Sequence, residues 1–203
     1  MKIVLIEGSP RRGGNTAQLA GLLAEHLQES GADVARISVA ERYFEPCNGC
    51  NACLKTGECV IDDERDAMPA IYQELENCDG LLWMTPLYFA GVPAQLKALI
   101  DRLQVYYGRR LLRGKPTTPR RPAAAVILGA GGDPFGAQAA ILTLRSASQM
   151  AEFTLADPLV ITGTEEPGDI SAERFASERA AALALADALR ERVQTQTQVS
   201  GDA

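Results

Sequence analysis

Hydrophobic residues along the chain alternate between short continuous runs and longer segments in which they recur every three or four positions. The run Lys2–Ile6 is almost wholly apolar, which is typical of a strand buried on both faces of a parallel sheet. In residues 15–29, by contrast, Leu19 and Leu23 fall on one helical face, and Asn15 stands where an N-terminal cap is expected. Both patterns repeat along the chain with no linker or internal repeat between them.

Five strands and five helices are predicted in this way. The strands cover Lys2–Ile6, Val34–Val39, Gly80–Met84, Ala123–Leu128 and Leu155–Ile161, and the helices cover residues 15–29, a segment marked by Met68, Ile71, Tyr72 and Leu75, then Val92–Tyr106, Gln138–Glu152 and Ser171–Val193. Such alternation requires parallel strands joined by right-handed crossovers. We therefore predict a doubly wound α/β fold of three layers with strand order 2-1-3-4-5. Residues 1–193 are expected to form one domain, followed by a disordered tail at 194–203.

Charge and composition exclude several classes of function. The net charge of −6, from 20 basic and 26 acidic residues, argues against nucleic acid as the main partner. No apolar stretch approaches the roughly 18 residues of a membrane span, and the first residues do not resemble a signal peptide, so a cytoplasmic protein is expected. The single histidine, His26, lies on an apolar helix face, so no histidine-based nucleophilic mechanism and no catalytic side chain are predicted.

Basic residues gather between the third predicted helix and the fourth strand. They are Arg109, Arg110, Arg113, Lys115, Arg120 and Arg121. A solvated surface or a contact between subunits is the favoured interpretation, and docking of an acidic electron-transfer partner is the alternative.

Three loops rich in glycine, proline or aromatic residues follow strands 1, 3 and 4, whose carboxyl ends meet at one edge of such a sheet. Residues 8–16 combine glycines with the hydroxyls of Ser9 and Thr16 and with the guanidinium of Arg11 or Arg12. This is a donor set suited to a phosphate at a helix N-terminus. Residues 85–93 place adjacent aromatics between prolines, which suits a flat apolar ligand. Residues 129–136 are glycine-rich and permit close backbone approach.

The ordered set of these motifs resembles the NAD(P)H-dependent FMN reductase and iron–sulfur flavoprotein families, over residues 1 to about 165. The matching stretches are Gly-Ser-Pro-Arg…Gly-Asn-Thr, Thr-Pro-Leu-Tyr-Phe…Leu-Lys…Ile-Asp-Arg and Gly-Ala-Gly-Gly. The resemblance implies a flavodoxin-like fold, FMN as cofactor, and a homodimer or homotetramer. It also implies FMN contacts from Ser9, Arg11, Gly14, Asn15, Thr16, Pro86, Leu87, Tyr88, Phe89, Gly131 and Gly132. Asp101 and Arg102 match a family position as well, where a structural role at a helix end is favoured.

Four cysteines crowd into a loop at residues 44–66, after the second strand and so at the same expected edge of the sheet. They are Cys47, Cys50, Cys53 and Cys59. Four thiolates at this spacing suit a [4Fe–4S] cluster or a zinc ion. The third interpretation is that the thiols bind no metal and form a small buried core of the loop. The compact run resembles that of the iron–sulfur flavoproteins. Cys78, outside the loop, is expected in the core.

Two functions of different classes follow from these observations. The first is an FMN-dependent oxidoreductase that takes electrons from NAD(P)H or from a ferredoxin-like donor. The second is an iron–sulfur flavoprotein that carries electrons and has no small-molecule substrate of its own. A zinc-stabilised nucleotide-binding module without redox chemistry is a weaker third alternative.

Overall fold

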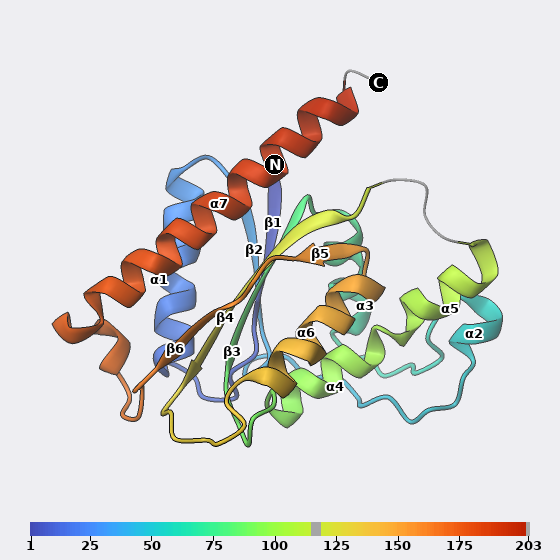
Figure 1. Ribbon diagram of the computed structural model, residues 1–203. Helices are drawn as coiled ribbons and strands as arrows, with labels where there is room; N and C mark the ends of the chain where they lie inside the picture. The colour runs from blue at the N-terminus through green and yellow to red at the C-terminus, as the bar shows by residue number, and fades with distance from the viewer. Residues whose placement is uncertain (115–118, 202–203) are drawn as a thin grey trace.

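The computed structural model describes residues 1–114 and 119–201 as a parallel sheet covered by helices on both faces (Figure 1). The elements are β1 (Lys2–Glu7), α1 (Asn15–Glu29), β2 (Asp33–Ser38), α2 (Cys53–Thr56), α3 (Met68–Glu76), β3 (Gly80–Pro86), α4 (Ala94–Arg102), α5 (Gln104–Arg113), β4 (Arg121–Gly129), α6 (Gln138–Met150), β5 (Phe153–Leu155), β6 (Leu159–Thr162), two short 3-10 turns at Asp169–Ser171 and Glu173–Phe175, and α7 (Ala176–Gly201). The strand order β2-β1-β3-β4-β5, with every pairing parallel, confirms the predicted topology.

The core is divided by the sheet into two halves. Helices α1 and α7 pack on one face, and α3, α4 and α6 pack on the other (Figure 1). Trp83 on β3 is fully buried, and its indole N–H donates a hydrogen bond to the Ser148 hydroxyl at 2.9 Å. Cys78 is buried at 3% exposure, as predicted. The loops that follow β1, β3 and β4 meet at one edge of the sheet (Figure 1).

The predicted fifth strand is divided in two. Residues 153–155 pair with the beginning of β4, and residues 159–162 pair with its end. Asp157 and Pro158 separate the two segments, and proline lacks the N–H that a continuous ladder requires. The predicted strand, Leu155–Ile161, spans this interruption because apolar residues lie on both sides of it.

The predicted third helix is also divided, because the chain turns at Leu103. The N–H of Leu103 donates to the Ile100 carbonyl at 3.0 Å, and the N–H of Tyr106 donates to the Leu103 carbonyl at 3.0 Å. These tighter three-residue turns separate α4 from α5, which continues past the predicted end to Arg113. Helix α2, within the cysteine loop, was not predicted.

The expected disordered tail from residue 194 is helical as far as the structure describes it, because α7 continues to Gly201. The Gln196 amide donates to the carbonyls of Pro119 and Arg120 at 3.3 and 3.2 Å, and the Thr197 hydroxyl donates to the Val193 carbonyl at 3.0 Å. These bonds give the polar segment partners that its composition did not reveal. Residues 202 and 203 lie outside the described range.

Candidate functional site

A cavity of about 370 Å³ lies at the carboxyl ends of β1, β3 and β4, and we call it the strand-end cavity. Its lining residues are Ser9, Arg11, Gly14, Asn15, Thr16, Pro86, Leu87, Tyr88, Leu128, Gly129, Ala130, Thr164, Glu165 and Pro167. The cavity thus brings together the predicted contacts from the first two loops, except Phe89. Gly131 and Gly132 are not among the lining residues, and their neighbours Gly129 and Ala130 take that side of the cavity.

The loop after β1 supplies hydrogen-bond donors to this cavity. The backbone N–H of Arg11 donates to the Ser9 hydroxyl at 3.1 Å, which fixes the turn before α1. Ser9 and Thr16 are each 3% exposed. No side chain among the described residues caps the first turn of α1, so its N–H groups remain available to an anion. Arg11 is the one cationic side chain of the lining as described.

Asn15 does not cap α1 as expected, since Gly14 holds the cap position and Asn15 is the first residue of the helix. Its amide N–H donates to the Glu166 carbonyl at 2.9 Å, and its amide oxygen accepts bonds from the N–H groups of Gly168 and Ile170 at 2.9 and 3.2 Å. Asn15 therefore ties the loop after β6 to the start of α1.

The loop after β6 also lines the strand-end cavity, although no sequence motif indicated it. Thr164, Glu165 and Pro167 line the cavity, and the N–H and hydroxyl of Thr164 both donate to the Gly129 carbonyl, at 3.1 and 3.2 Å. The loop follows a strand that points to the same edge, which was the available signal. Dividing the last strand correctly would have drawn attention to it.

The loop after β3 ends in a tight turn that carries an exposed aromatic side chain. Tyr88 and Gly91 exchange backbone hydrogen bonds of 2.9 Å in both directions. The two residues between them, Phe89 and Ala90, have φ values of 48° and 59°. Such turns favour asparagine and glycine at these positions, so both residues are conformationally strained. Phe89 is fully exposed at the tip.

Replacing Phe89 with asparagine is expected to raise the free energy of unfolding by about 1 kcal/mol, because asparagine tolerates positive φ. Urea unfolding measures the change. The control is Phe135→Asn, since Phe135 is 77% exposed but its φ is not positive. That variant should stay within about 0.5 kcal/mol of the original. Equal effects of both substitutions would show that the turn is not strained.

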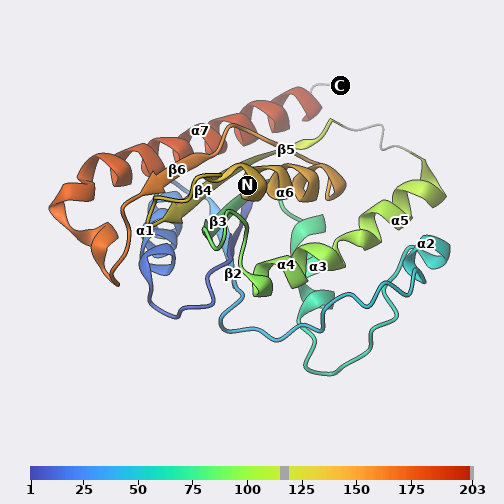
Figure 2. The same ribbon diagram turned by 60° about the horizontal axis from the view of Figure 1, so that its bottom comes forward.

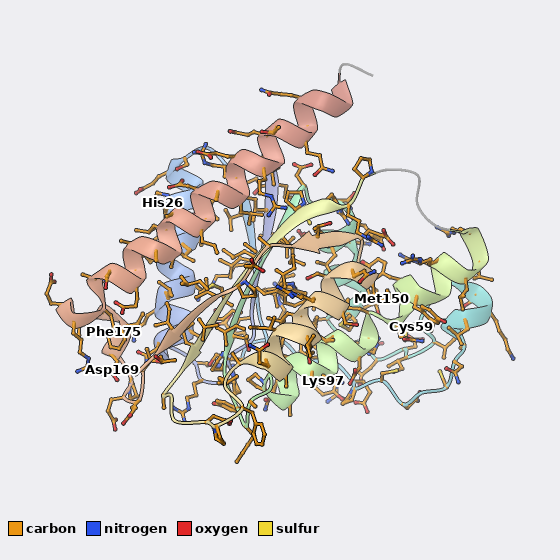
Figure 3. All side chains as sticks on the ribbon, in the orientation of Figure 1. His26, Cys59, Lys97, Met150, Asp169 and Phe175 are labelled. Carbon is orange, nitrogen blue, oxygen red and sulfur yellow. The ribbon has the colours of Figure 1, made fainter. Side chains whose placement is uncertain are left out.

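A second cavity, of about 250 Å³, lies beside α5, and we call it the cysteine cavity. It is lined by Cys47, Asn48, Gly49, Cys50, Asn51, Cys53, Cys59, Val60, Ile61, Asp101, Arg102, Gln104 and Val105. All four loop cysteines therefore face one space, and Figure 3 shows Cys59 next to α5. Among the described residues, no group of three or more His, Cys, Asp or Glu side chains is already arranged to hold a metal ion.

The two cavities have no lining residue in common. The cysteine loop leaves the sheet edge after β2 and runs sideways along α4 and α5 (Figure 2). It was expected beside the loops of the strand-end cavity, and the contacts of α5 account for the difference. A Cβ atom on Gly108 would lie 2.2 Å from the Cys53 carbonyl oxygen, so only glycine allows the two backbones to pack this closely. The Arg109 guanidinium donates to the Gly57 carbonyl at 2.8 Å.

Of the basic residues expected to be solvated or to form a subunit contact, Arg109, Arg120 and Arg121 have internal partners, whereas Arg113 is exposed. Arg109 pairs with Glu76 as well as binding the loop. The Arg121 guanidinium donates to the Leu75 and Cys78 carbonyls, each at 2.7 Å. Lys115 lies outside the described residues.

His26 forms a hydrogen-bonded pair with Asp187 on α7 (Nε2 to Oδ1, 3.0 Å), on the face of the sheet away from the cysteine cavity (Figure 3). This contact joins α1 to α7.

The cysteines differ in their exposure and in their acidity. Cys47 and Cys50 are exposed, Cys59 is partly buried and Cys53 is buried. Burial raises the pKa of Cys53, and repulsion from Cys59 and Cys47 adds to the effect. Burial raises the pKa of Cys78 to about 11. The thiolate is the reactive form, so reactivity should follow these differences.

Iodoacetamide at about pH 8 is therefore expected to alkylate Cys47 and Cys50 of the metal-free native protein and to leave Cys78 unmodified, because the Cys78 thiol is both buried and protonated. Peptide mass spectrometry measures the modification at each site. Protein unfolded in urea is the control and should be alkylated at all five cysteines. Equal modification of Cys78 and Cys47 in the native protein would contradict the burial described here.

No helix in residues 1–114 and 119–201 has the length and apolar character needed to cross a membrane.

Comparisons with known proteins agree on one family. Residues 1–165 match the family model described as NADPH-dependent FMN reductase. An iron–sulfur flavoprotein of Methanocaldococcus jannaschii is 34% identical over 167 residues, which cover 82% of this chain and 78% of the relative. An iron–sulfur flavoprotein of Methanosarcina thermophila is 39% identical over 102 residues, which cover 50% of this chain and 52% of that protein.

Among solved structures, a protein described as a quinone reductase from Klebsiella pneumoniae superposes with a TM-score of 0.67 at 22% identity, covering 93% of this chain and 85% of its own. That similarity shows the flavodoxin-like fold. The match to the family model includes every lining residue of the strand-end cavity except Pro167. The chain therefore belongs to the NADPH-dependent FMN reductase family of flavoprotein oxidoreductases, and it is similar in sequence to iron–sulfur flavoproteins.

Proposed function

We propose that the chain is an FMN oxidoreductase that holds FMN in the strand-end cavity and a [4Fe–4S] cluster in the cysteine cavity, and that it receives electrons from NAD(P)H or from a ferredoxin-like donor. The observation that carries the proposal is the separation of the cysteines from the strand-end loops into two cavities of different chemistry. One is rich in backbone and hydroxyl donors, and the other contains four thiols.

The two ends of the strand-end cavity suit the two ends of FMN, the phosphate and the isoalloxazine ring. The open first turn of α1, Thr16 and Arg11 would hold the phosphate, because helix N-terminal N–H groups and a guanidinium both favour an anion. Pro86, Leu87 and Tyr88 would contact the isoalloxazine ring with apolar surface. Bound flavin supplies the hydride and electron chemistry, and the chain itself positions the ring and limits its contact with water.

The cysteine cavity suits a metal centre through its donor set. Four thiols line it, and the buried Nε–H of Arg102, which also lines it, has no hydrogen-bond partner among the described residues. An occupant with thiolate or sulfide acceptors would satisfy that donor. A zinc ion takes the same four ligands, so it remains the alternative occupant.

Absorption spectra, with iron and sulfide analysis, of protein purified without oxygen test the proposal. Flavin bands together with a broad shoulder that bleaches on reduction, and iron near four atoms per chain, are expected. Flavin bands with zinc, or with no metal, would remove the cluster and leave an FMN reductase. Absence of flavin after FMN addition would overturn the assignment of the strand-end cavity.

A second candidate is an electron carrier with no small-molecule substrate of its own, and the iron–sulfur flavoprotein relatives favour it. Steady-state oxidation of NADH and NADPH by the loaded protein separates the two functions. The reductase should turn over with one of these donors and a quinone or free flavin as acceptor. The carrier should turn over only when a reduced ferredoxin is supplied.

The same proposal includes a homodimer or homotetramer. Phe89 at the turn after β3 and Phe135 in the loop after β4 are 102% and 77% exposed. Both loops lie at the edge of the sheet that carries the strand-end cavity. Large exposed aromatics of this kind are typical of interfaces. The Phe89→Ser and Phe135→Ser variants are therefore expected to have a lower molar mass in solution than the unmodified protein, and light scattering measures that mass.

A further inference from the structure

Arg102 is a buried cation that contacts both ends of the cysteine loop. It is the last residue of α4 and is 2% exposed. Its guanidinium donates to the Glu45 carbonyl, just before Cys47, at 2.7 Å. It also donates to the Asp66 carboxylate, where the loop ends, at 2.7 Å. The side chains of Arg102 and Asp66 are each 1% exposed.

The third donor group of Arg102 is not used by the protein. The Nε–H is buried, and the part of the chain that the structure describes offers it no partner. Buried polar groups rarely remain unpaired, because losing water without a replacement is unfavourable. Arg102 lines the cysteine cavity, so an acceptor inside that cavity is the natural partner.

Arg102 is the buried one of the two charged residues that line the cysteine cavity. The charged side chains of the described lining are Asp101 and Arg102. Asp101 is about half exposed and pairs with Lys97 at 2.6 Å, whereas Arg102 is shielded from solvent. The hydrogen bond to Asp66 raises the pKa of Arg102 although burial opposes its charge, so the guanidinium stays cationic.

We propose that Arg102 compensates the charge of the metal centre of the cysteine cavity. Its contacts with the two ends of the loop place a buried positive charge beside the thiolate ligands. Four thiolates around a dication, or around a dicationic cluster, retain a net negative charge. The nearby guanidinium stabilises that charge and stabilises it further when an electron is added. This inference rests on the proposed metal site.

The test uses Co²⁺ as a probe of thiolate binding in the metal-free, reduced protein. Absorption from thiolate-to-cobalt charge transfer reports the affinity. Replacing Arg102 with glutamine is expected to weaken Co²⁺ binding by about tenfold or more, because outer-shell partners of metal ligands contribute at this scale. Arg102→Lys, which retains the charge, should recover part of the loss.

Two further variants separate charge from simple loop restraint. Asp66→Asn leaves the Arg102 charge uncompensated, so Co²⁺ should bind at least as tightly as in the unmodified protein. A purely structural role predicts the opposite, since removing either partner would loosen the loop. Arg109→Gln is the matched control, because Arg109 binds the loop at Gly57 but does not line the cavity. It should change the affinity by less than about threefold.

After reconstitution with iron and sulfide, redox titration gives a second measurement. The midpoint potential should move to a more negative value in Arg102→Gln and to a more positive value in Asp66→Asn. Unfolding curves establish that each variant is folded. Parallel weakening in Arg102→Gln and Asp66→Asn, or no change in Arg102→Gln, would overturn the inference and leave the proposed site intact. Failure of the unmodified protein to bind Co²⁺ through thiolates would overturn both.

Discussion

The Thr16→Glu variant is expected to lose FMN, with an increase in Kd of about 100-fold or more, equivalent to about 2.7 kcal/mol. Thr16 lines the strand-end cavity in the first turn of α1, where the open N–H groups would receive the phosphate. A glutamate there places a carboxylate in the same field, so it competes for these donors and repels the phosphate. Quenching of flavin fluorescence on titration of apoprotein with FMN measures the loss.

Unfolding is not the expected cause of that loss. An acidic side chain near a helix N-terminus contributes about 0.3–1 kcal/mol of stability, and the cavity beside Thr16 gives the longer side chain space. The thermal unfolding midpoint of Thr16→Glu should therefore stay close to that of the unmodified protein.

Arg12→Glu is the matched control for long-range charge. Arg12 lies in the same loop and donates to the Ala40 carbonyl at 3.2 Å, but it does not line the strand-end cavity. This substitution changes the net charge more than Thr16→Glu does. If FMN binding depends on local donors, Arg12→Glu should affect Kd much less. A larger effect from Arg12→Glu would mean that the phosphate is held elsewhere, or only by the general field of the loop.

The sequence predicted the sheet and the edge at which the strand-end loops gather, because both depend on local patterns. Strands buried on both faces require continuous apolar runs, as in Lys2–Ile6, and topology then brings the strand-end loops together. Ser9, Thr16 and Pro86 therefore appeared together in the prediction, and they line one cavity in the structure. Phe89 was grouped with them because it is adjacent in sequence, but the strained turn directs it outward to full exposure.

The path of the cysteine loop could not be predicted in the same way, because it has no repeating pattern and depends on contacts distant in sequence. Arg102 bonds to Glu45 across 57 positions, and Arg109 bonds to Gly57 across 52. The family motif marked Arg102 for a structural role at a helix end but did not reveal its partners, and Arg109 was expected to be solvated or in a subunit contact. Gly108 has the sequence appearance of an ordinary interruption of helical propensity. The backbone partners of both arginines in the loop become evident only when α4 and α5 are placed against it.

Gly108→Ala is expected to lower the free energy of unfolding by about 1–3 kcal/mol and to impair metal binding in the cysteine cavity. The new Cβ would lie 2.2 Å from the carbonyl oxygen and 2.7 Å from the carbonyl carbon of Cys53. Both are backbone atoms, so no side chain can rotate away and the loop or α5 must shift. Urea unfolding measures the stability, and Co²⁺ absorption measures the metal site.

Gly21→Ala is the control, since Gly21 is also helical, in α1, and its Cβ would meet only the Arg36 guanidinium at an ordinary 3.7 Å. Alanine there should stabilise the protein by about 0.5–1 kcal/mol through helix propensity. The two substitutions are chemically identical, so their opposite signs would isolate the contact between α5 and Cys53. FMN affinity should be unchanged in both variants, because neither glycine lines the strand-end cavity. If Gly108→Ala instead gained stability and bound Co²⁺ normally, close packing on α5 would not be what holds the cysteine loop in place.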